Sequence, residues 1–455
     1  MKFVIAGGGD VGLAICRSLL QTGHTAILIE KNVQLVQELC ETLTIQVIAG
    51  DVTFFSTMQA IPWQQCDAFL AMTENDAVNL LSCTLAKTLG CPRTICRIHI
   101  DLQKELNDYN YQAHFAIDSL FNTQMSCAFA IAKLLRGNHR VVLEQLTQGS
   151  VELRALNIGK KSNFISKKVQ DLPNFGIRIG FIQRKNEFFI PNRDTLLQEN
   201  DRLTIAGDHA SIVDFCHQAD PHSDPVYITL FLTNEVSHAL ILLLQNPRFK
   251  IRIVEASLEK CQRMAEIYPH ISVIHGDATQ LSFLQEEQIQ YTDYFIACSD
   301  NEEKNIIACL QAKKAGAKHT ILWVNKDTYE DVCDSLASKL EVDHIISTQS
   351  CLWKDLQPLL FQQTFSKIET LEAETEHPIE IVEIQIPFGA KVEKLSLAQL
   401  NLPVHAVLLI LKHKFRAKVP GAEDVLLGGD RIVAAVEQKD TDRLFQFLTQ
   451  KTTLS

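Results

Sequence analysis

Three closely spaced glycines near the start of this 455-residue chain, directly after a short apolar run, most restrict its fold. The apolar run covers residues 2–6, the glycines are Gly7, Gly9 and Gly12, and a second apolar run ends in Glu30. This order predicts a strand, a tight turn, a helix and a second parallel strand, which is the βαβ unit typical of dinucleotide binding. The sequence therefore predicts a Rossmann-like parallel sheet at the N-terminus.

Each part of the pattern has a chemical reason. Gly7 suits the tight turn, Gly9 lets a pyrophosphate approach the backbone, and Gly12 lets the helix pack on the strand. The helix N-terminus supplies free N–H groups and partial positive charge to phosphates. Glu30 would accept hydrogen bonds from the adenosine ribose, which favours NAD(H) or an adenine nucleotide over a 2′-phosphorylated cofactor. A Rossmann core that holds no nucleotide is the alternative interpretation.

The chain also repeats itself with an offset of about 225 residues, and such internal repeats indicate how a chain is divided. The matched blocks are 49–53 with 275–279, 71–79 with 297–305, and 191–203 with 420–432. The last pair lies outside the Rossmann-like part, so the repeated unit includes a second, smaller module. We therefore expect two copies of one unit, each a Rossmann-like domain followed by a small β-rich module.

The predicted fold class is α/β, with two Rossmann-like doubly wound parallel-sheet domains, each followed by a small β-rich α+β module. The expected domains are 1–138, 139–222, 223–365 and 366–455. In the first copy we expect strands near 2–6, 26–30, 45–48, 67–71, 94–98 and 114–117. A buried helix near 119–136 follows, with a partner subunit among its candidate neighbours, and a period-two β pattern then covers about 139–220.

The second copy differs from the first where a ligand would bind. Leu232, Asn234 and Ser237 stand where the first copy has its three glycines. Side chains at these positions would obstruct the backbone approach that glycine permits. Glu255 still ends the second strand, but an acid at a strand end is often merely solvated. We therefore expect the second half to be a scaffold that has lost the nucleotide.

Composition excludes several classes of protein. The net charge of −11, without a long basic run, argues against nucleic-acid binding. No apolar segment reaches 18 residues, so we expect no membrane span, and the N-terminus is a strand rather than a signal peptide. The thirteen cysteines form no C-x-x-C pair, which predicts buried thiols in a reducing cytosol and no metal site.

Two Rossmann units, each with a β-rich module, make a chain that resembles the TrkA family of Trk-system potassium-uptake regulatory proteins. That family carries tandem regulator-of-conductance-of-potassium (RCK) domains, and the resemblance covers the whole chain. It implies a cytosolic ring of four chains, held peripherally at the inner face of the bacterial membrane. The ring would gate an integral-membrane, TrkH- or TrkG-like potassium-translocating subunit in response to NAD(H) and ATP or ADP. The site residues it implies are Gly7, Gly8, Gly9, Asp10, Val11, Glu30, Thr73, Glu74 and Arg97.

The remaining candidates at the sheet edge each have two interpretations. Asp51 follows the third strand and would either contact adenine or cap the next helix. Thr73, Glu74 and Asn75 follow the fourth strand, where ligands bind in open α/β folds, although they would also serve to cap a helix. Arg97 would either pair with a phosphate through its planar fork or remain a solvated residue at a strand end.

The competing class of function is an NAD-dependent oxidoreductase. Such an enzyme needs a substrate domain that places an acid or a base over the nicotinamide. This chain instead follows its Rossmann unit with a short β module, and it contains no Walker A loop, H-E-x-x-H or G-x-S-x-G. We therefore expect a regulator that is not an enzyme. A regulator of another transporter, such as a glutathione-gated potassium efflux system, is less favoured because no membrane segment is fused to the chain.

Overall fold

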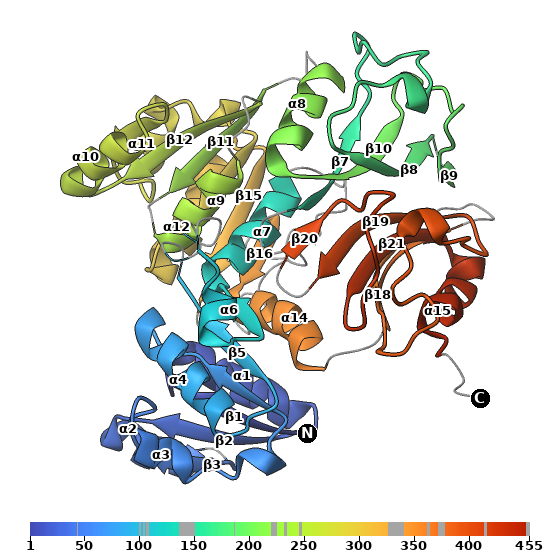
Figure 1. Cartoon of the computed structure of the whole chain (residues 1–455). Helices are drawn as coiled ribbons and strands as arrows, with labels where there is room; N and C mark the ends of the chain where they lie inside the picture. The colour runs from blue at the N-terminus through green and yellow to red at the C-terminus, as the bar shows by residue number, and fades with distance from the viewer. Residues whose placement is uncertain are drawn as a thin grey trace. The chain divides into compact units, whose positions relative to one another are not determined.

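The computed structural model of the chain forms two compact units. It describes residues 1–42, 44–99, 102, 105, 109–135, 151–185, 187–219, 225–231, 234–244, 248–325, 341–361, 365–371, 378–413 and 416–451. The first unit comprises Met1–Leu135 with Pro225–Leu360, and the second comprises Arg136–Asp224 with Phe361–Ser455 (Figure 1). Each half of the repeat therefore contributes one part to each unit.

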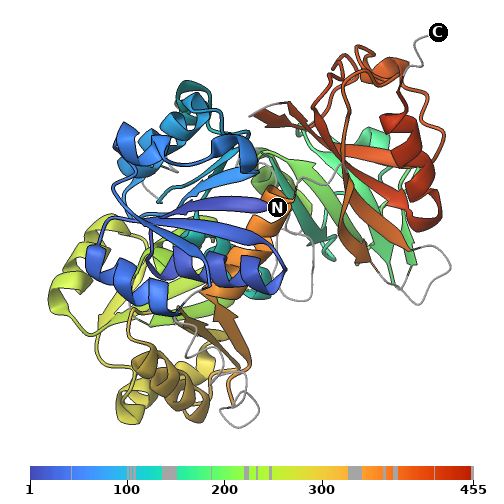
Figure 2. The same ribbon diagram turned by 90° about the horizontal axis from the view of Figure 1, so that it is seen from below.

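The first half of the first unit is a six-stranded parallel sheet in the order β3-β2-β1-β4-β5-β6. Its strands are β1 (Lys2–Ala6), β2 (Thr25–Glu30), β3 (Gln46–Ala49), β4 (Ala68–Ala71), β5 (Thr94–Arg97) and β6 (Ser119–Phe121). The helices are α1 (Asp10–Gln21), α2 (Val33–Thr42), α3 (Phe55–Gln59), α4 (Asp76–Thr88) and α6 (Tyr111–Phe115), with a 3₁₀ turn η1 (Trp63–Gln65). Helices lie on both faces of the sheet (Figure 2). Because the strand order reverses between β1 and β4, a crevice for ligands is expected at their carboxyl ends.

The second half of this unit repeats the topology as β13-β12-β11-β14-β15-β16. Its strands are β11 (Val226–Phe231), β12 (Phe249–Glu255), β13 (Ser272–His275), β14 (Tyr294–Ala297), β15 (His319–Val324) and β16 (His344–Ser347). Its helical elements are α9 (Glu235–Leu243), α10 (Leu258–Ile267), α11 (Leu281–Glu286), η4 (Ile289–Tyr291) and α12 (Glu302–Lys314). The expected fold class, two Rossmann-like sheets in one chain, is confirmed.

The two halves exchange a helix. Helix α7 (Thr123–Leu135) leaves the first sheet and packs against α9, while its counterpart α14 (Thr348–Leu360) packs against α1 and α7. Cys127, Ile131 and Leu135 of α7 belong to an apolar core that is otherwise built by the second half. The guanidinium of Arg93 donates a hydrogen bond to the carbonyl of Leu360. We call this contact between the halves, formed by α7 and α14 with α1, α9 and Arg93, the seam.

The structure confirms a buried helix near 119–136, although this helix covers Thr123–Leu135 because residues 119–121 form β6, and it identifies the neighbours of this helix. They belong to the other half of the same chain, and a partner subunit among the neighbours of this helix stays a prediction. The strand expected near 114–117 is wrong, because those residues complete α6, which ends at Ala116 in a left-handed conformation (φ 52°). The side chain of Asn110 caps α6, and the strand β6 begins only at Ser119. Four apolar-rich residues are too few for periodicity to distinguish a helical turn from a strand.

The second unit contains two antiparallel sheets, in the orders β7-β10-β8-β9 and β17-β18-β21-β19-β20. The first module consists of β7 (Glu152–Asn157), η3 (Val169–Asp171), β8 (Arg178–Arg184), β9 (Glu187–Phe189), β10 (Arg202–Gly207) and α8 (His209–Ala219). The second consists of β17 (Phe365–Leu371), β18 (Ile379–Gln385), η5 (Leu397–Gln399), β19 (Ala406–His413), β20 (Arg416–Lys418), β21 (Arg431–Glu437), η6 (Gln438–Asp440) and α15 (Thr441–Thr449). The period-two β pattern expected over about 139–220 is wrong for His209–Ala219, which form the helix α8. Residues 139–150 of this expectation lie outside the described residues.

The two modules share an apolar core that includes Phe181 and Leu409. A Cβ atom on Gly180 would lie 2.8 Å from a methyl carbon of Leu409, so β8 and β19 approach as closely as a glycine allows. In the part of the chain that the structure describes, no helix has the length and apolar character needed to cross a membrane. The described cysteines are free thiols, and all are buried except Cys40, Cys216 and Cys351.

Candidate functional site

The three glycines of the first turn have different structural roles. Gly7 has a φ of +99°, and a Cβ atom there would lie 3.2 Å from Thr73. A Cβ atom on Gly12 would lie 1.9 Å from the carbonyl oxygen of Gly7, so helix and turn meet without room for a side chain. Gly9 has an ordinary extended conformation (φ −74°, ψ −178°), and a Cβ atom there would have no neighbour within 4 Å. The fold itself needs Gly7 and Gly12, whereas Gly9 leaves open space.

The N-termini of the two equivalent helices differ in how they are capped. Gly9 is the N-cap of α1, and no side chain caps this helix. In the second half, the side chain of Asn234 accepts a hydrogen bond from the N–H of Ser237 (3.1 Å), and the Ser237 hydroxyl accepts one from the N–H of Asn234 (2.9 Å). Side chains therefore occupy two of the N–H donors at the α9 N-terminus, while the α1 N-terminus, which has no such cap, remains available to an anion. Leu232 lies outside the described residues.

Glu30 braces the glycine turn. Its carboxylate accepts hydrogen bonds from the N–H of Gly8 (2.6 Å) and from the N–H of Asn32 (2.8 Å). A Cβ atom on Gly8 would lie 3.1 Å from this carboxylate, which explains why position 8, between Gly7 and Gly9, is also a glycine. The equivalent Glu255 is only 2 % exposed and accepts a hydrogen bond from the N–H of Ser257 (3.0 Å). The interpretation of Glu255 as a solvated residue at a strand end is therefore wrong.

Asp51 closes a turn of its own. It accepts hydrogen bonds from the N–H (2.9 Å) and the hydroxyl (2.7 Å) of Thr53, and these bonds lower the pKa of Asp51. The N-cap of α3 is Phe54, so the helix-capping interpretation of Asp51 is wrong. Asp277 makes the same two bonds to Thr279 in the half without the glycines (3.0 and 2.8 Å). The turn therefore explains this acid without a ligand, and its contact with adenine stays a prediction.

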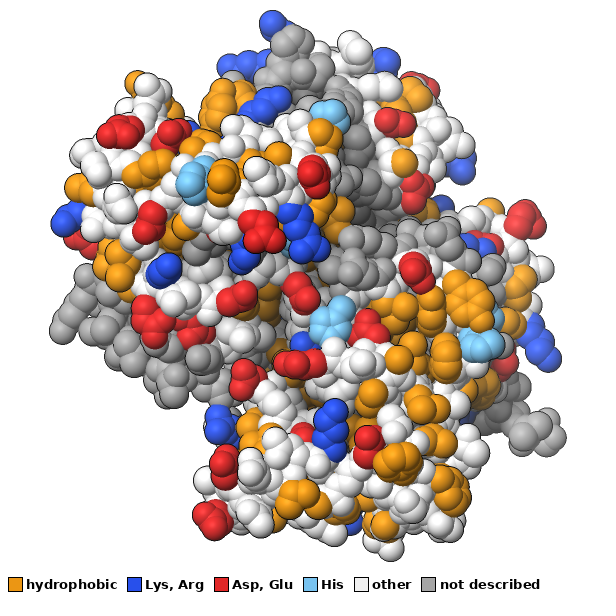
Figure 3. Space-filling view, turned by 90° about the vertical axis from the view of Figure 1, so that its left-hand side faces the viewer, with side chains coloured by type: hydrophobic (Ala, Val, Ile, Leu, Met, Phe, Trp, Pro, Cys, Tyr) orange, Lys and Arg blue, Asp and Glu red, His pale blue; other side chains and the backbone are white. Residues whose placement is uncertain are grey.

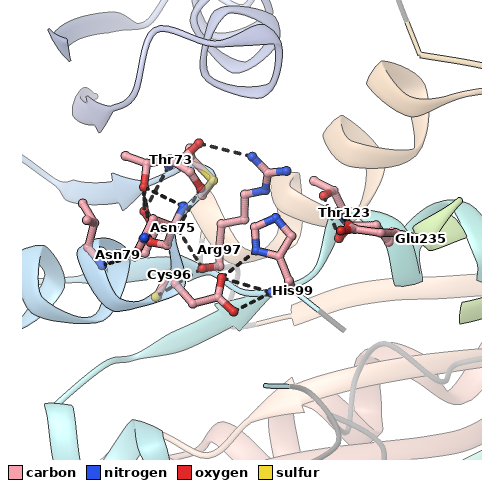
Figure 4. Close-up of polar contacts among 12 residues, drawn as sticks. Thr73, Asn75, Asn79, Cys96, Arg97, His99, Thr123 and Glu235 are labelled. Atoms are coloured by element: carbon pink, nitrogen blue, oxygen red, sulfur yellow. Dashed lines mark hydrogen bonds and ion pairs between the residues drawn. The ribbon is translucent and has the colours of Figure 1, made fainter. Parts of the chain in front are cut away.

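Thr73 is held by a buried asparagine that the sequence pattern did not single out (Figure 4). The side-chain oxygen of Asn79 accepts hydrogen bonds from the N–H (3.0 Å) and hydroxyl (2.7 Å) of Thr73. Its amide group donates to the carbonyls of Thr73 (2.9 Å) and Arg97 (3.0 Å). Asn79 thus joins the ends of β4 and β5, while the neighbouring Asn75 caps α4 by accepting a bond from the N–H of Val78 (3.0 Å).

Asn305 makes the equivalent contacts in the second half. Its oxygen accepts from the N–H (3.0 Å) and hydroxyl (2.5 Å) of Ser299, and its amide donates to the carbonyls of Ser299 (2.9 Å) and Trp323 (3.3 Å). Both asparagines are fully buried. They end the repeated blocks 71–79 and 297–305, so their identity in both copies was the signal that marks them as structural.

We expect Asn79→Ala to lower the free energy of unfolding by roughly 2–4 kcal/mol, because buried backbone groups of Thr73 and Arg97 lose their partners. Urea unfolding of the purified chain measures this. Asn305→Ala is the matched control and should destabilise to a similar extent. Only Asn79→Ala should also weaken nucleotide binding, and an equal effect of both variants on binding would contradict the prediction.

Arg97 is buried at the carboxyl end of β5. Its side chain is 8 % exposed, so the alternative of a solvated arginine at a strand end is wrong. One guanidinium nitrogen donates to the carbonyl of Met72 at 3.5 Å, and Nε has no hydrogen-bond partner among the described residues. Burial lowers the pKa of Arg97, and the negative charges of Glu74, Glu235 and Asp76 oppose this shift. A buried cation with an unused donor is suited to an anionic ligand, although its contact with phosphate stays a prediction.

His99 lies next to Arg97 and was missed by sequence reasoning. Its Nδ1 lies 2.7 Å from a carboxylate oxygen of Asp76, and its N–H donates to the same carboxylate at 3.1 Å. The hydrogen bond with Asp76 raises the pKa of His99, while burial and Arg97 lower it. In the second half, Glu302 similarly accepts a hydrogen bond from the N–H of Asn325 (2.7 Å). The acid is thus a structural element of both halves, and the imidazole is present only in the first.

The predicted site residues meet at one edge of the first sheet. The turn from Gly7 to Gly12 contacts Thr73, Gly8 contacts Glu30, and Arg97 reaches Met72 beside Thr73. Asp10 and Val11 form the first turn of α1, and Glu74 is exposed after β4. The described residues contain no group of three or more His, Cys, Asp or Glu side chains arranged to hold a metal ion. On the described part of the face in Figure 3, Lys and Arg side chains are scattered among acidic ones.

Comparison with known protein families identifies both kinds of module. The TrkA-N domain model matches residues 3–117 and 233–348, and the TrkA-C domain model matches residues 153–219. A Trk system potassium uptake protein TrkA homolog of Archaeoglobus fulgidus is 27 % identical over 449 residues, covering 98 % of this chain and 99 % of the relative. The Trk system potassium uptake protein TrkA of Halomonas elongata is 24 % identical over 463 residues, covering 98 % and 99 %.

Among solved structures, the GsuK channel bound to NAD is similar with a TM-score of 0.56 and 14 % identity, covering 98 % of this chain and 78 % of that chain. The GsuK RCK domain is similar with a TM-score of 0.56 and 15 % identity, covering 98 % and 94 %. At these identities the likeness concerns the fold: tandem Rossmann-like sheets with β-rich modules.

Proposed function

This chain belongs to the TrkA-N domain family, and we propose that it is a nucleotide-sensing regulatory subunit of a Trk-type potassium uptake system. In this proposal the first half binds NAD(H), ATP or ADP through Gly7–Gly12, Glu30, Asp51, Thr73, Glu74 and Arg97. The subunit then gates potassium transport through a TrkH- or TrkG-like integral-membrane partner. Its relatives are named for potassium uptake, and a structural neighbour is described as bound to NAD, which supports the proposal.

The observation that carries the proposal is the difference between the two equivalent helix N-termini. The α1 N-terminus has no side-chain cap and open space at Gly9, which is the arrangement that phosphate binding requires. The α9 N-terminus is closed by the capping box of Asn234 and Ser237. We infer that each chain binds one nucleotide, in its first half, and that the second half acts as a scaffold.

We propose that regulation works by a shift of population between two arrangements of a four-chain ring at the inner face of the membrane. A duplicated chain offers two similar surfaces, so a closed ring needs few copies. A nucleotide that contacts the two arrangements differently favours one of them by its difference in affinity.

The alternative function is an NAD-dependent oxidoreductase. The Asp76–His99 pair favours it, because a carboxylate that orients an imidazole is a common acid-base arrangement. Against it, the β-rich modules form a separate compact unit, and each half of the repeat carries one. We therefore propose a regulator without turnover of its own.

The two functions are separated by one set of measurements on the purified chain. Light scattering should give four times the mass of the chain. Potassium flux into vesicles that carry the membrane subunit should change when the chain and NADH or ATP are added. A monomer that leaves the flux unchanged and oxidises NADH with a small substrate would overturn the proposal in favour of the oxidoreductase.

We expect Glu30→Ala to weaken NADH and ADP by roughly 1–3 kcal/mol, since the ribose hydroxyls lose a charged acceptor. The difference in affinity between NADH and NADPH should also narrow, because the carboxylate that repels a 2′-phosphate is gone. Calorimetric titration measures both effects. Glu255→Ala, the matched change in the second half, should leave all three affinities as they are. Equal affinity of the unmodified chain for NADH and NADPH would show that the Glu30 carboxylate does not contact the ribose hydroxyls.

A further inference from the structure

We propose that Glu235, from the half without a glycine turn, sets how much ligand charge the first-half site accepts. In this inference its carboxylate disfavours nucleotides whose phosphate chain extends past the glycine turn to Arg97. The site would therefore discriminate against a nucleoside triphosphate relative to a dinucleotide such as NADH. This inference rests on the proposed function and specifies its ligand preference.

A continuous path leads from the glycine turn to Arg97. The position of a Cβ atom on Gly7 is 3.2 Å from Thr73, and the adjacent Met72 carbonyl accepts the 3.5 Å hydrogen bond from Arg97. Arg97 is 8 % exposed, and no described residue accepts a hydrogen bond from its Nε. In this inference a phosphate chain that starts at Gly9 and follows the end of β4 extends toward this guanidinium.

Glu235 is drawn beside Thr123 in Figure 4, on the other side of Arg97 and His99 from Thr73. It lies in the first turn of α9, across the seam from the first sheet, and the side-chain amide of Gln124 on α7 donates to its carboxylate at 2.5 Å. Figure 4 shows Arg97 and His99 between the Thr73–Asn79 network and Glu235. Burial lowers the pKa of Arg97, and the hydrogen bond with Asp76 raises the pKa of His99. The negative charge of Glu235 adds to these influences and favours the charged form of both side chains.

Two consequences follow for a ligand. A carboxylate held near Arg97 offsets part of the positive charge that attracts phosphate, and it repels a terminal phosphate that approaches Arg97. ATP carries one more ionised phosphate than ADP and extends further along the path, so it feels this repulsion most. Since Gln124 and Glu235 both belong to the seam, the repulsion acts directly on the contact between the halves. A half that has lost its own nucleotide turn would in this way still respond to the ligand of the other half.

The test is a calorimetric titration of the full chain with ATP, ADP and NADH, at low salt and without divalent cations. Glu235→Gln keeps the size of the side chain and removes its charge, so we expect ATP to bind about tenfold more tightly and NADH to change less than threefold. Raising the salt concentration should shrink the difference between the variant and the unmodified chain. Glu259→Gln is the control, because Glu259 is also an acid in the first turn of a second-half helix, α10, and is exposed.

An unchanged ratio of ATP to NADH affinity in Glu235→Gln would overturn the inference and leave the proposed function intact. The same gain in Glu259→Gln would also overturn it, because net charge alone would then explain the effect. If the unmodified chain binds none of the three nucleotides, the proposed function fails, and the inference fails with it.

Discussion

Gly9→Val is expected to abolish the binding of NADH, ADP and ATP while the protein keeps its fold. The Gly9 backbone is extended, with a φ of −74° that any residue adopts, and a Cβ atom there meets nothing within 4 Å. The valine side chain therefore costs the folded protein little, but it fills the space that a pyrophosphate needs beside the α1 N-terminus. We expect no measurable heat in a calorimetric titration, together with an unchanged circular-dichroism melting curve.

The control for this prediction is Asn234→Ala at the equivalent position of the second half. It removes the cap of α9 and should cost about 1 kcal/mol of stability while nucleotide affinity stays the same. Normal binding by Gly9→Val would show that the nucleotide is held elsewhere. Two sites of similar affinity per chain would show that the second half has another way to hold phosphates.

Gly12→Ala is expected to give the opposite result, a large loss of stability. The added Cβ atom would lie 1.9 Å from the carbonyl oxygen of Gly7, and both belong to backbone that cannot move independently of α1 and β1. Relieving this overlap means lifting the helix from the sheet, so we expect a loss of more than about 3 kcal/mol or failure to fold. Thermal unfolding measures this.

Gly9→Ala is the matched control, because it makes the same chemical change in the same turn where space is available. Together the two alanine variants separate the structural glycine from the ligand-binding glycine. If Gly12→Ala unfolds at the same temperature as Gly9→Ala, the turn is looser than the structure shows.

The parts of this molecule that sequence reasoning predicted are those encoded by local pattern. The glycine turn, Glu30 at the end of β2 and the repeat of the whole unit all depend on residues that are close in sequence or on comparison of the chain with itself. The same reasoning placed the sixth strand wrongly and missed α8, because short apolar runs do not distinguish a helical turn from a strand.

The remaining features depend on contacts between distant residues. Burial of Arg97, the bond from Gln124 to Glu235 and the bond from Arg93 to Leu360 arise only when the halves meet at the seam. No local pattern encodes such contacts, so Arg97 was left with a solvated alternative and Glu235 was not considered. Asn79 was not singled out either, although its match with Asn305 was visible in the repeat.

The exchange of α7 and α14 makes the two halves tethered partners rather than independent domains. A covalent link of this kind holds the second partner at an effective concentration on the order of millimolar, whatever the concentration of the protein. The second half therefore stays beside the first, and it buries the apolar face of α7 from the first half in its own core. Selection on its glycine turn can then relax without loss of the assembly. If the second half binds no nucleotide, as we propose, it still contributes the surface it covers and the charge it presents.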